Sequence, residues 1–402
     1  MASTAIGNLG SLARYRRIID VIRLCARFCG TDISSPDWRW NWLTRLVVVM
    51  IFSFYTCTIY TVYEGVFVQK DRTIIMQATC FLGGAVQGMT KMFCCISYRQ
   101  ALRESQALLD ATFMKYEQKH MGYQQVLIDG IAMTMRGIKS FVVFIGIALA
   151  IIIGFPISYY ILYNKKIMIM QLLVPGIDPN TNTGFLILIG AHIACLFLGA
   201  FGNFAGDMYL FVFINNLPML KNILGCRLQD LNDLLDGNCS QAELHAEMVK
   251  IVNLHQQYLS LLERSQRIFF HPIFVQIFAT ASGILCTMFC LVMGVWPAAP
   301  AYLGYGIVTL YFYCGLGSIV EASNDDCCTI IYTKCQWYRL PLPYQKLLLF
   351  MLHKSQTMKN LTVGNMMPLS MTTAMNLSKA VYSLLMLLLN NADDVGGSVK
   401  SE

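Results

Sequence analysis

Seven long apolar stretches, separated by flanks that alternate in positive charge, constrain this chain more than any other feature. The stretches cover residues 43–63, 74–96, 140–163, 185–214, 268–295, 301–322 and 370–390. Each has roughly the 20 residues that an α-helix needs to cross a hydrocarbon core of ~30 Å. Lipid offers backbone groups no hydrogen-bond partners, so such spans are expected to be helices. The sequence therefore predicts an all-α membrane protein with seven transmembrane helices, and its content of 56% hydrophobic and 13% charged residues fits that class.

Lysine and arginine residues lie mainly in every second flank. Segments 1–42, 97–139, 215–267 and 323–369 carry five or six each, whereas the flanks between them carry at most two. Positive charge is retained on the cytoplasmic side of a membrane during insertion. This predicts a cytoplasmic N-terminus and an extracellular tail at 391–402. We expect the basic inner face to attract anionic membrane lipid and not nucleic acid.

Two of the basic segments show helical periodicity. In residues 10–29, apolar side chains recur at helical spacing among arginines, which predicts an amphipathic helix on the inner leaflet of the membrane. A second apolar stripe runs through 241–267 directly into the fifth span. Its members are Leu244, Met248, Ile251, Leu254, Tyr258 and Leu261. Segment 241–267 and a short apolar helix expected at 346–356 predict inner helix extensions that pack into a cytoplasmic bundle. The alternative is that they lie on the membrane surface.

The predicted outer loops are short, so a stimulus from outside must be small enough to enter between the helices. A pocket for a small apolar ligand is lined by aromatic side chains with a few polar groups. Such residues gather in the outer halves of several spans. The candidates are Phe81, Phe155, Tyr159, His192, Tyr305, Thr309 and Phe312. Tyr159, His192, Tyr305 and Thr309 are the candidates for a hydrogen bond to the ligand, although each residue is as readily explained by ordinary packing.

Signatures of enzymes and of metal sites are absent from the sequence. It has no phosphate-binding loop, no H-E-x-x-H and no G-x-S-x-G. Its six histidines are not clustered at metal-ligand spacing. We therefore expect no catalytic activity, no metal and no cofactor. The charged residues Lys91, Asp207 and Glu321 lie toward the predicted inner ends of their spans, where pairing is cheap, and we interpret them as mainly structural.

The last 70 residues carry an ordered series: a Trp-Tyr-x-Leu-Pro turn, a lysine before leucines, a glutamine one helix later, and then Gly, Pro-Leu-Ser and Lys-x-x-Tyr-Ser. The residues are Trp337, Tyr338, Leu340, Pro341, Lys346, Gln356, Gly364, Pro368, Leu369, Ser370, Lys379, Tyr382 and Ser383. This series is similar to the C-terminal signature of insect odorant receptors. The length, span count and loop asymmetry extend the resemblance over the whole chain. It departs at 372–374, where Thr-Thr-Ala replaces the family's frequent Glu-Thr-Phe.

The resemblance implies a ligand-gated, non-selective cation channel in the plasma membrane of an olfactory neuron. A ligand-binding subunit would form a heterotetramer with a shared co-receptor, and a small volatile apolar or aromatic odorant would open it. Segment 215–267 is too short for the co-receptor itself. The implied domains are an N-terminal segment 1–42, helices and pocket in 43–322, an anchor at 323–369 and a pore helix at 370–390. The implied gate consists of Leu385 and Leu389.

Two other classes remain open. A gustatory-type channel would share the fold and conduct as a homotetramer without a co-receptor. A G-protein-coupled receptor also has seven spans, but its N-terminus is extracellular, and the chain lacks the Asp-Arg-Tyr and Asn-Pro-x-x-Tyr motifs of that class.

Overall fold

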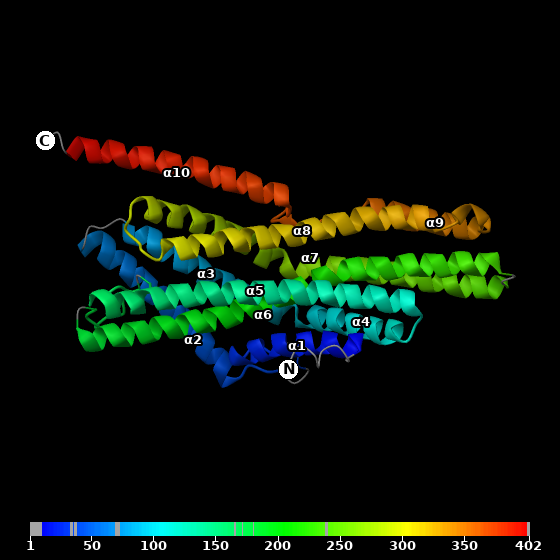
Figure 1. Ribbon diagram of the computed structural model, residues 1–402, viewed down its shortest axis with the longest axis horizontal. Helices are drawn as coiled ribbons and strands as arrows, with labels where there is room; N and C mark the ends of the chain where they lie inside the picture. Colours follow the sequence, from blue (N-terminus) through cyan, green and yellow to red (C-terminus); the bar gives the residue numbers. More distant parts are fainter. Residues whose placement is uncertain are drawn as a thin grey trace.

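The computed structural model describes residues 10–32, 35, 38–68, 73–164, 166–170, 172–179, 181–237 and 240–399, with side chains described as far as 390. The end of the predicted tail, 400–402, lies outside this part of the chain. Long helices run side by side along the long axis of the molecule, and shorter helices cover one half of its length (Figure 1).

The helices in chain order are α1 Ser11–Phe28, α2 Trp42–Tyr63, α3 Thr73–Ser97, α4 Arg99–Glu117, α5 Met121–Tyr163, α6 Asn182–Asp236, α7 Gln241–Val292, α8 Ala299–Lys334, α9 Leu342–Gln356 and α10 Met371–Val399. A π-helical turn over Glu64–Val68 continues α2, and a 3-10 turn over Trp337–Arg339 precedes α9. Two short strands, β1 Thr362–Val363 and β2 Met367–Pro368, form an antiparallel hairpin before α10. The hairpin is a small addition to the predicted all-α architecture.

The seven predicted apolar stretches fall on α2, α3, α5, α6, α7, α8 and α10. Within the described residues, six helices are long and apolar enough to cross a membrane: Trp42–Val68, Met121–Tyr163, Asn182–Asp236, Gln241–Val292, Ala299–Lys334 and Met371–Asn390. The 25-residue helix α3 is long enough, but no 18-residue stretch of it is as apolar as those of the other six. Its polar residues Gln77, Gln87 and Lys91 lower the mean hydropathy of the helix, yet their side chains are buried against other helices.

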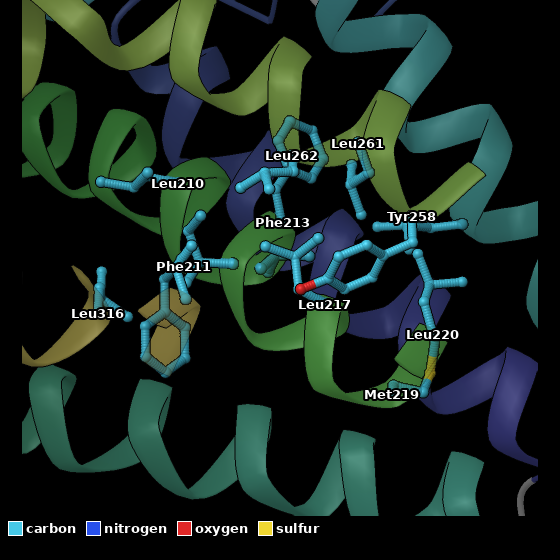
Figure 2. Packing of buried hydrophobic residues seen from close by; sticks show 14 of the residues in the cluster. Leu210, Phe211, Phe213, Leu217, Met219, Leu220, Tyr258, Leu261, Leu262 and Leu316 are labelled. Carbon is cyan, nitrogen blue, oxygen red and sulfur yellow. The ribbon is translucent and has the colours of Figure 1, made fainter. Parts of the chain in front are cut away.

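The C-terminal half of α6 and the N-terminal half of α7 form a protein core. All six members of the predicted stripe of α7 are at most 4% exposed. Figure 2 shows Tyr258 and Leu261 of α7 facing Leu217 of α6. The expectation that these extensions pack together is confirmed, and the alternative that this stripe lies on a membrane surface is wrong for the described chain.

Helix α1 departs from the prediction. Ile18, Ile19 and Ile22 are at most 9% exposed and join the core, and Tyr15 stacks on Phe113 of α4 with ring centroids 4.6 Å apart. Helices α4, α5 and α6 therefore cover these three isoleucines in place of lipid, whereas Phe28, the last member of the predicted stripe, is 56% exposed. An amphipathic pattern is the same whether protein or lipid covers the apolar face.

Candidate functional site: a cavity between the long helices

A cavity of about 310 Å³ lies between α2, α3, α5, α6, α7 and α8. This volume is at the lower end of the range for small-molecule pockets. Aromatic residues of α3 and α8 form one end, and charged residues of α3 and α6 form the other. Its wall is mostly apolar, with Val47, Met50, Ile51 and Phe54 contributed by α2.

Phe81 and Tyr302 line the aromatic end, and Trp296, which lies off the wall between α7 and α8, packs behind them. Phe81 lies edge-to-face against Tyr302, with ring centroids 5.1 Å apart, and Trp296 lies 4.6 Å from Tyr302. The Tyr302 hydroxyl is buried and has no hydrogen-bond partner among the described residues. A buried hydroxyl without a partner costs about 1–3 kcal/mol.

Glycines set the width of the middle of the cavity. Gly84 of α3 and Gly199 of α6 both belong to the wall, and a Cβ atom built at either position meets nothing within 4 Å. A larger side chain at Gly84 would therefore occupy open space without displacing its neighbours.

A buried ion pair forms the charged end. The Lys91 ammonium lies 2.5 Å from the Asp207 carboxylate and donates to Asn203 Oδ1 at 3.1 Å. The Tyr313 hydroxyl of α8 donates to the same carboxylate. Lys91 and Asp207 are each 4% exposed, and their mainly structural role stays a prediction. Glu321, the third charged residue of that group, is exposed instead.

Of the seven predicted pocket residues, Phe81 and Tyr305 lie on the cavity wall. His192 does not, because its ring is fully buried with Nε2 3.1 Å from the Leu172 carbonyl oxygen. The Thr309 hydroxyl donates to the Tyr305 carbonyl at 2.8 Å, so it serves the helix backbone.

The remaining three predicted residues also lie off the wall. Phe312 stacks on Phe141 at 4.4 Å between centroids and packs against the main core. Phe155 and Tyr159 of α5 are half-buried and lie 6.0 Å apart. Ligand contact by any of the seven stays a prediction.

Sequence reasoning missed the polar side of the cavity. Cys80, Gly84, Gln87 and Lys91 follow each other on α3 at intervals of three or four, and all four line the wall. That spacing places them on one face of the helix. A stripe of small and polar residues in an otherwise apolar span was the signal available in the sequence.

The predicted gate residues lie on the inward side of α10. Leu385 is 3% exposed and Leu389 is half-buried within the single chain. Lys379, Ser383 and Leu387 are exposed on the opposite side. Burial of Leu385 argues against a pore-facing position in this arrangement. Among the described residues, no three His, Cys, Asp or Glu side chains are grouped to hold a metal ion.

The fold defines a multi-pass helical membrane protein that encloses a mostly apolar cavity. Residues 72–382 match the family described as 7tm Odorant receptor, and the chain belongs to that family. It is therefore an insect odorant receptor, a membrane receptor of a non-enzymatic class.

Individual relatives agree with this assignment. "Putative odorant receptor 83c" of Drosophila melanogaster is 23% identical over 399 residues, which cover 94% of this chain and 98% of that protein. The olfactory receptor OR5 from Machilis hrabei has a similar fold, with a TM-score of 0.75, 13% identity and coverage of 94% of this chain and 99% of that chain. The structure of the same receptor in complex with eugenol gives a TM-score of 0.70 at 12% identity, covering 93% and 97%.

Proposed function

We propose that the chain is the ligand-binding subunit of an odorant-gated, non-selective cation channel in the plasma membrane. The observation that carries this proposal is the cavity, which has aromatic side chains at one end. The chain that encloses it belongs to a family of odorant receptors. A small volatile apolar or aromatic odorant binds there. The N-terminus lies in the cytoplasm and α10 contributes to a pore shared by several subunits.

Gating follows from differential affinity. An odorant that binds the cavity of the open arrangement more tightly than that of the closed one shifts the population toward the open channel. A hydrophobic constriction in the pore closes by losing its water, so a small movement of α10 suffices.

Assembly with a co-receptor is supported by an apolar surface that the single chain leaves uncovered. Leu342, Leu349 and Phe350 on α9 are 63%, 64% and 72% exposed. Large exposed apolar patches mark interaction sites. We infer that this surface packs against neighbouring subunits of a heterotetramer.

Whole-cell recording from cells that express this chain with and without an insect co-receptor tests the proposal, with a panel of small volatiles as stimuli. We expect current only when both subunits are present. Current from this chain alone would instead establish a homomeric, gustatory-type channel. Responses that require G-protein turnover, with an N-terminal tag accessible outside intact cells, would establish a G-protein-coupled receptor.

A further inference from the structure

The charged end of the cavity carries a desolvation penalty that apolar side chains at the same positions would avoid. Lys91 and Asp207 are almost fully buried, and both line the cavity. Removing two charges from water costs several kcal/mol per ion, and well-packed apolar side chains of similar size are often as stable as a buried pair. Ionisable residues within membrane helices therefore point to a functional site.

Two glycines make room for the polar side chains where α3 and α6 cross. A Cβ atom at Gly206 would lie 3.1 Å from Lys91 Cβ, and a Cβ atom at Gly88 would lie 3.2 Å from Asn203 Nδ2. Both distances are tighter than ordinary contacts. Each helix thus presents a glycine to the polar side chain of the other, which holds that side chain in one place beside the cavity.

Two carboxamide side chains on the cavity wall each have an N–H group available for a further hydrogen bond. Asn203 Nδ2 donates to the Gly199 carbonyl at 3.0 Å, and Gln87 Nε2 donates to Thr280 Oγ1 at 3.3 Å. A carboxamide nitrogen carries two N–H donors. The bonds among the described residues use one donor of each, which leaves a second N–H for an acceptor atom of a ligand.

We infer that this end of the cavity is a hydrogen-bonding subsite for the oxygen of a neutral, elongated odorant whose apolar body extends toward Phe81 and Tyr302. This inference rests on the proposed function and names the chemistry of its ligand. Ten residues of α3 separate Phe81 from Lys91, a rise of about 15 Å along the helix. A compact odorant fills one end, whereas a medium-length chain reaches both.

The charge balance selects a neutral ligand. Lys91 and Asp207 neutralise each other, so a carboxylate would have to replace Asp207 as the partner of Lys91, and an ammonium would have to replace Lys91 as the partner of Asp207. A neutral carbonyl or hydroxyl oxygen accepts from the carboxamides and leaves the pair intact. Unbranched aldehydes are suitable probes because each has an alkane of nearly the same shape.

Dose-response curves for the aldehydes from hexanal to decanal, and for the matching alkanes, test the inference in cells that express the chain with a co-receptor. We expect the longer aldehydes to act at concentrations about tenfold lower than their alkanes, as one buried hydrogen bond predicts. Asn203→Leu reduces this difference, because one of the two carboxamide donors is lost and Gln87 keeps the other. The control is Asn216→Leu, because Asn216 Nδ2 makes the same kind of bond on α6, to the Val212 carbonyl at 2.7 Å, but does not line the cavity.

Equal potency of aldehydes and alkanes in the wild type, or an unchanged difference in Asn203→Leu, would overturn the inference. So would activation by other odorants and by no aldehyde. Silence of the wild type toward every volatile, with surface expression confirmed, would instead contradict the proposed function.

Charge variants give a second readout. Asp207→Asn leaves Lys91 without its carboxylate and is expected to gain a response to nonanoic acid, whereas Lys91→Met is expected to gain one to nonylamine. Gain of neither response by variants that reach the cell surface would count against a ligand near the pair. A single buried charge can prevent folding, and for variants that do not reach the surface the Asn203→Leu comparison decides.

Discussion

The backbone amide of Met371, the first residue of α10, donates a hydrogen bond to the Ser318 hydroxyl of α8 at 3.0 Å. Helix α8 also supplies Tyr302 and Tyr305 to the cavity and Tyr313 to the Asp207 carboxylate. A single helix therefore touches both the candidate ligand site and the start of the proposed pore helix. Movement of α8 on ligand binding would be passed directly to α10.

Gly317→Ala should disrupt this junction. A Cβ atom at Gly317 would lie 1.8 Å from the Leu369 carbonyl oxygen, and because that atom belongs to the backbone, the chain before α10 must move. We expect odorant-evoked current to fall at least about tenfold, which corresponds to a loss of only ~1.4 kcal/mol. Current per channel at the cell surface is the measurement.

Gly315→Ala is the matched control. It lies two residues earlier on α8, and its Cβ would meet only the Met371 sulfur at 4.0 Å, an ordinary contact. Near-wild-type current is expected there. Equal currents from the two variants would show that α10 does not depend on this close approach.

Gly84→Leu should narrow the cavity without unfolding the protein. The position faces open space, and leucine favours a helix more than glycine does by roughly 1 kcal/mol. Responses to large odorants should fall about tenfold or more, with smaller losses for compact ones. Gly146→Leu on α5 is the control, because that glycine also faces open space but does not line the cavity. A uniform loss across odorant sizes in Gly84→Leu would argue against a steric role.

The sequence could predict helices but not which side chains meet between them. The stripe of α7 was predictable because its period of 3.6 residues gives one buried face wherever the helix packs. The cavity was not, because it depends on side chains that leave a gap across several helices. His192 and Thr309 have the residue types of a ligand site, yet each bonds to a main-chain carbonyl nearby. Nothing in the local sequence distinguishes these two situations.

Acid should loosen the contact between α7 and α9. His255 lies in the extension of α7 before its predicted span and is 3% exposed, with Nε2 2.9 Å from Ser355 Oγ. Burial, with a smaller contribution from the Lys354 charge, lowers the pKa of His255 from 6.5 to about 4. The unfolded chain therefore binds more protons than the folded one between these values. This contribution to stability is complete above pH 6.5 and is lost as the pH falls toward 4, by on the order of 3 kcal/mol.

Thermal unfolding of the purified protein in detergent across this pH range measures the effect. His255→Gln stays neutral throughout, so its melting temperature should depend less steeply on pH below 6.5 than that of the wild type. Identical slopes for the two proteins would assign the acid sensitivity to other groups.

Leu385 and Leu387 lie on opposite sides of α10. Leu385 is 3% exposed in the single chain, whereas Leu387 is 57% exposed. A pore enclosed by several copies of this helix would be lined by side chains that one copy leaves uncovered. Lys379 lies on the same side as Leu387 but eight residues earlier, about 12 Å along the axis. It would therefore stand in a vestibule away from the constriction and not repel cations at the narrowest point.

Leu387→Ala should widen the constriction, raise current in the absence of odorant and change rectification, with normal surface expression. Leu385→Ala should instead leave a gap in packing that costs about 2–5 kcal/mol and lowers expression. Recording basal current beside surface labelling separates the two effects. If Leu385→Ala reaches the surface and alters rectification while Leu387→Ala does not, the gate lies at Leu385 as the sequence resemblance implied, and α10 must rotate about its axis when the subunits assemble.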